Sequence, residues 1–161
     1  MTAAKLEPSL QDVYRSLVLD HSRNPRHFGR PEHVTHVADG INPLCGDKLR
    51  LYLDIDDDGK IQTSGFEGTG CAISIASASL LTETVIGLPV GDADACYREV
   101  TRRLTSGTKE AAARDDLEER LQDVRALDGV RAFPARVKCA TLAWRALHAA
   151  IQNDHVPATT E

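Results

Sequence analysis

The segment 48–67 reads KLRLYLDIDDDGKIQTSGFE, and its first eight residues alternate between two kinds of side chain. The apolar set consists of Leu49, Leu51, Leu53 and Ile55, and the other set of Lys48, Arg50, Tyr52 and Asp54. A period of two is typical of a strand that packs one face on a core. Residues 56–59, DDDG, favour a turn, and residues 61–67 can return as a second strand. The sequence therefore predicts a β-hairpin, to which residues 33–41 can add a third strand.

Helical patterns flank this hairpin on both sides. Ser9 precedes an apolar stripe and has Asp12 three residues later, which is the pattern of a capping box. A run of small and apolar residues follows Cys71 as far as residue 86. Pro134 suits the first turn of a last helix, whose apolar stripe consists of Ala140, Trp144, Leu147 and Ile151. Together these patterns predict an α+β fold, with a small three-stranded antiparallel sheet packed against several helices.

A charged stretch interrupts these patterns at about residues 92–128, with ten acidic and seven basic side chains. This composition favours one or two solvated helices, so we expect a charged helical insertion on the surface. Residues 156–161 are expected to form a frayed tail. A chain of 161 residues is long enough for one core and too short for two ordinary domains. We therefore expect residues 1–161 to form a single domain.

Composition excludes several classes of function. A net charge of −5 and only 4% aromatic residues argue against nucleic acid as a partner. No apolar stretch approaches membrane-spanning length, and the first residues lack a secretory signal, so we expect a cytoplasmic protein without a membrane partner. In that reducing compartment, the four cysteines are better interpreted as metal ligands, reactive thiols or core residues than as disulfides.

Two of the four cysteines lie beside glycine. Cys45 and Asp47 stand on either side of Gly46, which allows the backbone to bend so that the thiol and the carboxylate converge. Cys71 follows Gly70 at the expected start of a helix, where the helix dipole and nearby N–H groups favour a thiolate. Both contexts suit an anionic metal ligand.

Cys139 has two cationic neighbours near the start of the last helix. Arg136 and Lys138 should lower the pKa of this thiol. With the two other thiols and the carboxylate, Cys139 completes a set of three sulfur donors and one oxygen donor, which zinc accepts in tetrahedral geometry. The alternative is that the cysteines are buried core residues, a common place for free cysteine. That alternative fits Cys96 better, because its context is helical, and we expect Cys96 not to be a ligand.

A calcium loop is a competing interpretation of the acidic turn. Asp54, Asp56, Asp58 and Gly59 match the first half of such a loop. The twelfth position is Gly65, however, where a bidentate glutamate is required, and the flanking patterns are strands and not helices. We therefore interpret these residues as a hairpin turn.

Four ordered motifs resemble the IscU/NifU-like family of iron–sulfur cluster assembly proteins, and more closely its SufU branch. They are DHSRNPR at 20–26, NPLCGD at 42–47, FEGTGCAIS at 66–74 and PARVKCAT at 134–141. The resemblance covers about residues 13–151. It implies an α/β sandwich with a metal site at one end, where Cys45, Asp47, Cys71 and Cys139 would be the ligands.

Two features separate this sequence from the scaffold branch of the family, which is typified by IscU. Lys138 stands where IscU scaffolds have histidine, and residues 133–137, FPARV, replace a Leu-Pro-Pro-Val-Lys chaperone site. The resemblance therefore implies a zinc-dependent sulfurtransferase, in which Cys45 accepts persulfide sulfur from a SufS-type cysteine desulfurase and Arg136 steadies the anionic site. Downstream Suf cluster-assembly proteins would be the further partners. The alternative is a scaffold on which the same ligands hold iron as a transient [2Fe–2S] cluster.

Overall fold

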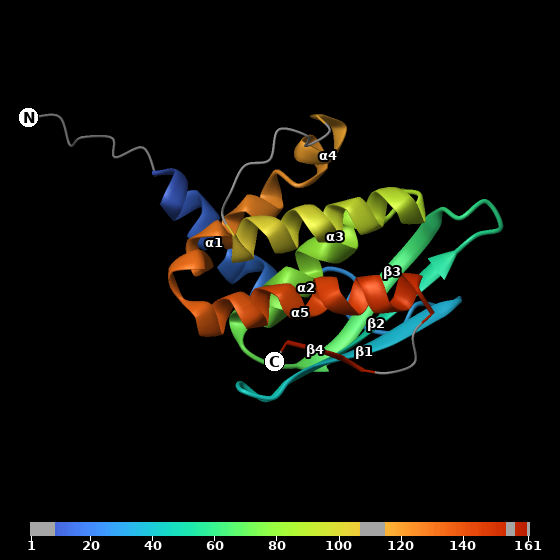
Figure 1. Ribbon diagram of the computed structural model, residues 1–161, viewed down its shortest axis with the longest axis horizontal. Coiled ribbons are helices and arrows are strands. Elements are labelled where there is room, and N and C mark those ends of the chain that lie inside the picture. Colours follow the sequence, from blue (N-terminus) through green and yellow to red (C-terminus); the bar gives the residue numbers. More distant parts are fainter. Residues whose placement is uncertain (1–8, 107–114, 154–156, 161) are drawn as a thin grey trace, which may run out of the picture.

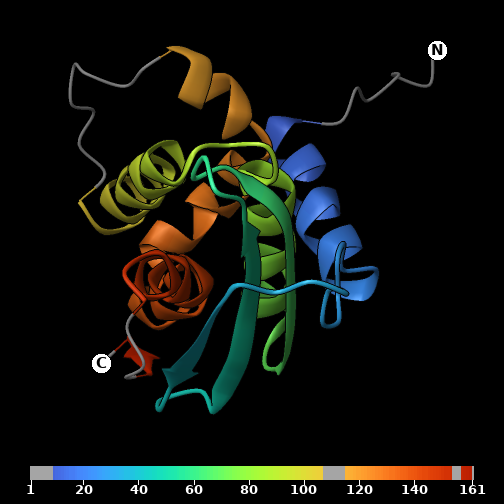
Figure 2. The same ribbon diagram turned by 90° about the vertical axis from the view of Figure 1, so that its right-hand side faces the viewer.

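The computed structural model describes residues 9–106, 115–153 and 157–160. Four strands form one sheet in the order β3-β2-β1-β4, beside a layer of helices (Figures 1 and 2). The strands are β1 (His36–Asn42), β2 (Asp47–Ile55), β3 (Ile61–Thr69) and β4 (Ala158–Thr159). The helices are α1 (Leu10–Arg23), α2 (Ala72–Val85), α3 (Val90–Thr105), α4 (Asp115–Arg120) and α5 (Pro134–Ile151), with a 3₁₀ segment η1 (Asp123–Ala132). The α+β fold expected from the sequence is confirmed.

The core lies between the sheet and the two helices α2 and α5. Leu49, Leu51 and Leu53 of β2 are buried, as their alternation predicts, and β2 pairs antiparallel with both β1 and β3. Helix α5 packs closely on β1, because a Cβ atom at Gly40 would lie 3.2 Å from the Leu142 side chain. Helix α1 contacts α2, and α3 contacts α5, which completes the helical layer. None of the helices in the described part of the chain is long and apolar enough to cross a bilayer.

Short helix signals in the sequence match the observed helix ends. Ser9 and Asp12 form the predicted capping box at α1. Cys71 is the N-cap of α2, and Pro134 occupies the first turn of α5. Trp144 is fully buried and donates from its Nε1 to Ser77 Oγ at 3.1 Å. The stripe on α5 is therefore core, as expected.

The sheet has four strands, and the expectation of three antiparallel strands is corrected. The extra strand, β4, has only two residues and pairs in parallel with Gly40 and Ile41 of β1. The expected frayed tail at 156–161 lies partly outside the described residues, but residues 157–160 are described and include β4. Two residues are too short to show a strand period, which is why the sequence pattern misses them.

The charged stretch at 92–128 is more than a solvated insertion. Helix α3 buries a stripe of Ala93, Cys96, Val100 and Leu104. Leu121, Val124 and Leu127 are buried as well, so this stretch contributes part of the main core. The helices are amphipathic, and the many charged residues of their outer face hide the apolar stripe in a composition count. Residues 107–114, within this stretch, lie outside the described residues.

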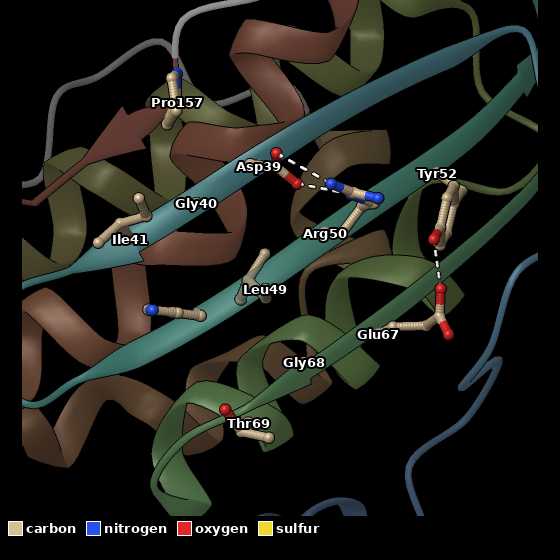
Figure 3. A pocket seen from close by; sticks show the side chains of 11 residues that line it. Asp39, Gly40, Ile41, Leu49, Arg50, Tyr52, Glu67, Gly68, Thr69 and Pro157 are labelled. Carbon is tan, nitrogen blue, oxygen red and sulfur yellow. Dashed lines mark hydrogen bonds and ion pairs between the residues drawn. The ribbon is translucent and has the colours of Figure 1, made fainter.

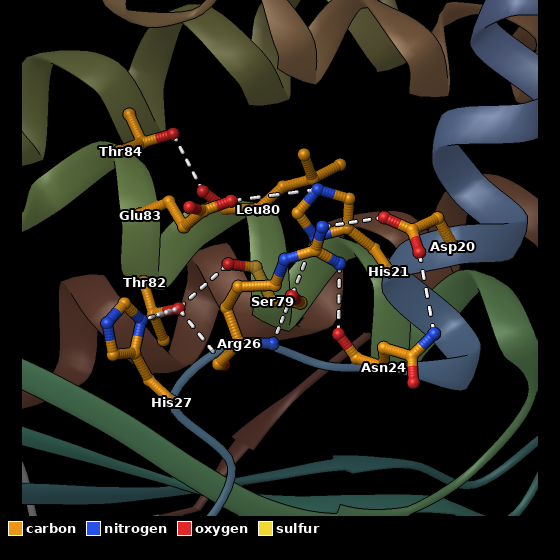
Figure 4. A network of polar contacts seen from close by, with 10 residues as sticks. All are labelled: Asp20, His21, Asn24, Arg26, His27, Ser79, Leu80, Thr82, Glu83 and Thr84. Carbon is orange, nitrogen blue, oxygen red and sulfur yellow. Dashed lines mark hydrogen bonds and ion pairs between the residues drawn. The ribbon is translucent and has the colours of Figure 1, made fainter.

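The motif at 20–26 joins the end of α1 to α2 (Figure 4). The main-chain N–H of Arg26 donates to Ser79 Oγ at 2.8 Å, and that hydroxyl lies 2.7 Å from Nδ1 of the buried His21. Burial lowers the pKa of His21, in keeping with a neutral ring that accepts the Ser79 proton. The Arg26 guanidinium in turn pairs with Asp20 at 2.6 Å. This motif therefore has a structural role in the described residues.

Candidate metal centre

The turn between β1 and β2 carries Cys45 at one end of the sheet. Asn42 and Asp47 are paired across this hairpin, and the Gly46 N–H donates to the Asn42 carbonyl at 2.9 Å. Gly46 has φ of +73°, a conformation that suits glycine and reverses the chain within four residues. The turn leaves the Cys45 thiol exposed.

Asp47 is almost completely buried on the inner face of the sheet. Its Oδ1 accepts the Cys71 main-chain N–H at 2.9 Å, and its Oδ2 accepts from Asn42 Nδ2 at 3.2 Å. Gly70 is required beside it, because a Cβ atom there would lie 2.5 Å from Asp47 Oδ1. Burial alone would raise the pKa of Asp47, but the hydrogen bonds, led by that of the Cys71 N–H, outweigh burial and lower it. The carboxylate is thus held charged and fixed in position.

Cys139 reaches the same point from α5. Its Sγ lies 3.6 Å from Cys45 Sγ, and the ligand atoms of Cys45, Asp47 and Cys139 all lie within 4.8 Å of one another. Burial and the neighbouring acidic groups raise the pKa of the Cys139 thiol. The expectation that Arg136 and Lys138 would lower the pKa of this thiol is therefore wrong. The sulfur is buried, whereas the Arg136 side chain is exposed.

Cys71 lies next to this cluster and is half-buried. Its main chain binds Asp47, while its Sγ lies 3.7 Å from Ser74 Oγ. Although burial acts to raise the pKa of the Cys71 thiol, hydrogen bonds from the Ser74 main chain and side chain outweigh burial and lower it. This direction agrees with the expectation for a thiol at a helix start. The structure therefore brings three of the four expected ligand atoms into one cluster and places the fourth residue in contact with it.

The remaining residues of interest lie in two different environments. Arg136 is exposed on the first turn of α5, three residues before Cys139, and the described residues include no ion-pair partner for its side chain. Cys96 is fully buried on α3 within the main core, away from the cluster. Asn42 was not expected at the site, although its closeness to Cys45 and Asp47 in the sequence was a signal.

The family that matches the sequence is the NifU-like N terminal domain, over residues 13–140. The chain belongs to this NifU-like family. Three relatives extend the comparison to nearly the whole chain, and they carry two different descriptions.

The zinc-dependent sulfurtransferase SufU of Bacillus subtilis is 38% identical over 146 residues, which is 91% of this chain and 94% of the relative. The iron–sulfur cluster assembly scaffold protein IscU of Streptococcus pyogenes is 38% identical over 144 residues, covering 89% of this chain and 86% of the relative. A crystal structure from Fervidobacterium islandicum, of a proposed scaffold protein for the SUF system, shares 32% identity at a TM-score of 0.74, over 84% of this chain and 93% of that one.

The donor atoms of this NifU-like chain fit a tetrahedral metal. Zinc–sulfur bonds of about 2.3 Å in a tetrahedron place two sulfurs about 3.8 Å apart. The observed Cys45–Cys139 separation of 3.6 Å is close to that value and far longer than a disulfide bond. Thiols and a carboxylate are also the donors that zinc accepts. Cys45, Asp47 and Cys139 could therefore hold one zinc ion, and Cys71 lies beside them as the remaining expected ligand.

A groove of about 470 Å³ lies on the outer face of the sheet, away from the helices (Figure 3). Its lining is mixed and includes Ile41, Leu49 and the ion pair Asp39–Arg50, with 2.7 Å between Asp39 Oδ1 and Arg50 Nε. Tyr52 donates to Glu67 on the same face. The groove contains none of the four cysteines, so it is separate from the metal centre.

Proposed function

We propose that this chain is a zinc-dependent sulfur acceptor of iron–sulfur cluster assembly, and that Cys45 takes persulfide sulfur from a cysteine desulfurase. The observation that carries the proposal is an exposed thiol placed 3.6 Å from a buried one, at a cluster of metal-binding atoms. The likeness to a zinc-dependent sulfurtransferase over 91% of the chain supports the same activity.

Exposure selects Cys45 as the acceptor. A thiol that attacks a sulfur on another protein must be reachable from outside, and Cys45 is exposed, whereas Cys71 is half-buried and Cys96 and Cys139 are buried. The turn is also loosely packed, because a Cβ atom at Gly46 would meet nothing within 4 Å. Cys45 can therefore leave its neighbours without moving a packed element.

The other proposed ligands suit a fixed role. Asp47 is held by two hydrogen bonds, Cys139 is buried on α5, and Cys71 is tied to the start of α2. A bound zinc ion would keep the coordinated thiols deprotonated at neutral pH. This matters here because burial raises the pKa of the Cys139 thiol. Three anchored groups would then leave one mobile thiolate, that of Cys45.

The transfer is a thiol exchange in which atoms and electrons balance. The Cys45 thiolate attacks the terminal sulfur of the desulfurase persulfide, and the bond between that sulfur and the desulfurase cysteine breaks. Cys45 becomes a persulfide, and the desulfurase cysteine leaves as a thiolate. Neither an oxidant nor a reductant is needed.

Arg136 is the proposed cationic neighbour of this exchange. It lies one turn before Cys139 on the same side of α5, exposed toward solvent. A guanidinium there would attract the anionic persulfide as the partner approaches. We also propose that the partner is a SufS-type desulfurase, that Suf cluster-assembly proteins receive the sulfur, and that the setting is the cytoplasm, where thiols remain reduced.

A scaffold function is the second candidate, and the likeness to an IscU scaffold protein over 89% of the chain favours it. In that case iron and sulfide would be the cargo, held by the same thiols as a [2Fe–2S] cluster. Lys138 argues against it, because a lysine at this position replaces the histidine of the scaffold branch.

Purification under reducing conditions with elemental analysis separates the two candidates. The sulfur acceptor should be colourless, contain about one zinc per chain, and raise sulfur release from cysteine by a desulfurase. A red-brown protein with two irons per cluster and no zinc would reject the proposal in favour of the scaffold. A matched control is Cys96→Ser, which should keep the zinc content.

A further inference from the structure

Asn42 lies beside the proposed ligands without being one of them. It is the last residue of β1, it is fully buried, and it pairs with Asp47 across the hairpin. Residues paired in this way direct their side chains to the same face of a sheet. Its main-chain carbonyl also accepts from Gly46, which closes the turn that carries Cys45.

The amide of Asn42 joins two elements of the site. Its Nδ2 lies 3.2 Å from Asp47 Oδ2 and 3.5 Å from Cys139 Sγ, a usual length for a hydrogen bond to sulfur. A carboxylate only accepts hydrogen bonds, so the amide must present its two N–H groups here and not its oxygen. One side chain thus donates to a proposed ligand on β2 and to another on α5.

The oxygen atom of the same amide, Asn42 Oδ1, is placed unfavourably for stability. Among the described residues, Asn42 Oδ1 is buried without a hydrogen-bond partner. A buried, unpartnered carbonyl oxygen destabilises a fold, and an apolar side chain of similar volume would avoid this penalty. The gain from this amide therefore lies on its N–H side, toward Asp47 and Cys139. The amide adds two N–H donors aimed at two of the proposed metal ligands.

We propose that Asn42 is a positioning residue of the metal centre, which holds the Asp47 carboxylate and the Cys139 thiolate in their metal-binding orientation. Hydrogen bonds of this kind fix the direction of a ligand and tune its charge. Asp47 is then held from both sides, by Asn42 on Oδ2 and by the Cys71 N–H on Oδ1. The inference rests on the proposed zinc function and adds a residue to it.

The test compares Asn42→Leu and Asn42→Ala with a matched control, Ser77→Ala. Ser77 lies on α2 and is buried against α5, where it accepts from Trp144 and donates to the Ala140 carbonyl. Its sequence neighbours and these two partners are not proposed ligands. Zinc affinity is measured by competition with a chelator. The cobalt-substituted proteins are compared by their thiolate-to-cobalt absorption, and melting of the metal-free proteins measures stability alone.

Both Asn42 variants should bind zinc about 10- to 100-fold more weakly than wild type. Their thiolate-to-cobalt band should move to longer wavelength, because a thiolate that loses an N–H donor gives up its electrons more easily. Ser77→Ala should melt earlier but keep the zinc affinity and the cobalt band. Wild-type affinity and an unshifted band in either folded Asn42 variant would overturn the inference alone. A wild-type protein that takes up no zinc would overturn it together with the proposed function.

Discussion

Two regions of the molecule meet at the proposed metal centre, the turn that carries Cys45 and the helix that carries Cys139. Their sulfur atoms lie 3.6 Å apart, yet the two regions differ in exposure and in packing. The turn is exposed and depends on a glycine with positive φ. The helix is packed between the sheet and α3, and its thiol is buried. From this contrast we infer two different roles: the buried groups retain the metal, and the exposed thiol reacts.

Removal of zinc should have the largest effect on stability, because the ion would bind ligands from both the turn and the helix. A ligand present at 1,000 times its Kd stabilises by about 4 kcal/mol, so a chelator should lower the melting temperature by roughly 8–16 °C. Differential scanning fluorimetry before and after chelation, with zinc added back, checks this. An unchanged melting curve after proven metal loss would mean that zinc does not stabilise the fold.

Cys139→Ser should weaken zinc binding by about two orders of magnitude. Structural zinc sites contribute about 10–16 kcal/mol through four ligands, or about 3 kcal/mol for each ligand. Cys45→Ser should cost less, about 10-fold, because water can replace an exposed ligand. Chelator competition on both variants measures the difference, and equal losses would remove the proposed distinction between anchor and mobile thiol.

Substitution of one glycine in each region tests the same difference between the buried site and the exposed turn. Gly70→Ala should weaken zinc binding by about 10-fold, because its Cβ atom would displace the buried Asp47 carboxylate. Gly46→Ala meets open space and should cost only about 1–2 kcal/mol of backbone strain at its positive φ. Zinc titration and thermal melting of both variants are the measurements. A larger loss of zinc affinity in Gly46→Ala would indicate that the turn, and not Asp47, anchors the site.

Cys96→Ser should have the smallest effect on the metal centre. Cys96 is fully buried in the core, so its replacement by a polar hydroxyl should lower the melting temperature by a few degrees. Zinc content by elemental analysis and sulfur acceptance should both stay at the wild-type level. Loss of zinc in this variant would show that the set of ligands has been assigned wrongly.

Much of the fold could be predicted because its elements have clear periods. The alternation through Leu49, Leu51 and Leu53 predicts β2 and its buried face, and the stripe that includes Trp144 predicts α5. The apolar stripe of α3 is also present in the sequence, but the charged residues around it favour a solvated helix. Strand β4 has no such signal, because two residues show no period.

Three of the expected ligand residues could be predicted from the sequence, but the electrostatics of the site only in part. Cys45, Asp47 and Cys139 do lie together, as the motifs imply. The pKa of Cys139 depends on burial, however, and its neighbours Arg136 and Lys138 in the sequence gave the wrong sign. The role of Asn42 depends on the pairing of β1 with β2, which places it opposite Asp47 and within reach of α5.

The central claim is that the exposed turn, and not the buried anchor, receives the sulfur. Incubation with a cysteine desulfurase and cysteine, followed by alkylation, digestion and mass spectrometry, measures it most directly. We expect an added sulfur mass on the peptide that contains Cys45, and its loss in Cys45→Ser while part of the zinc is retained. An added sulfur found only on the peptides of Cys71 or Cys139 would show that Cys45 is not the acceptor.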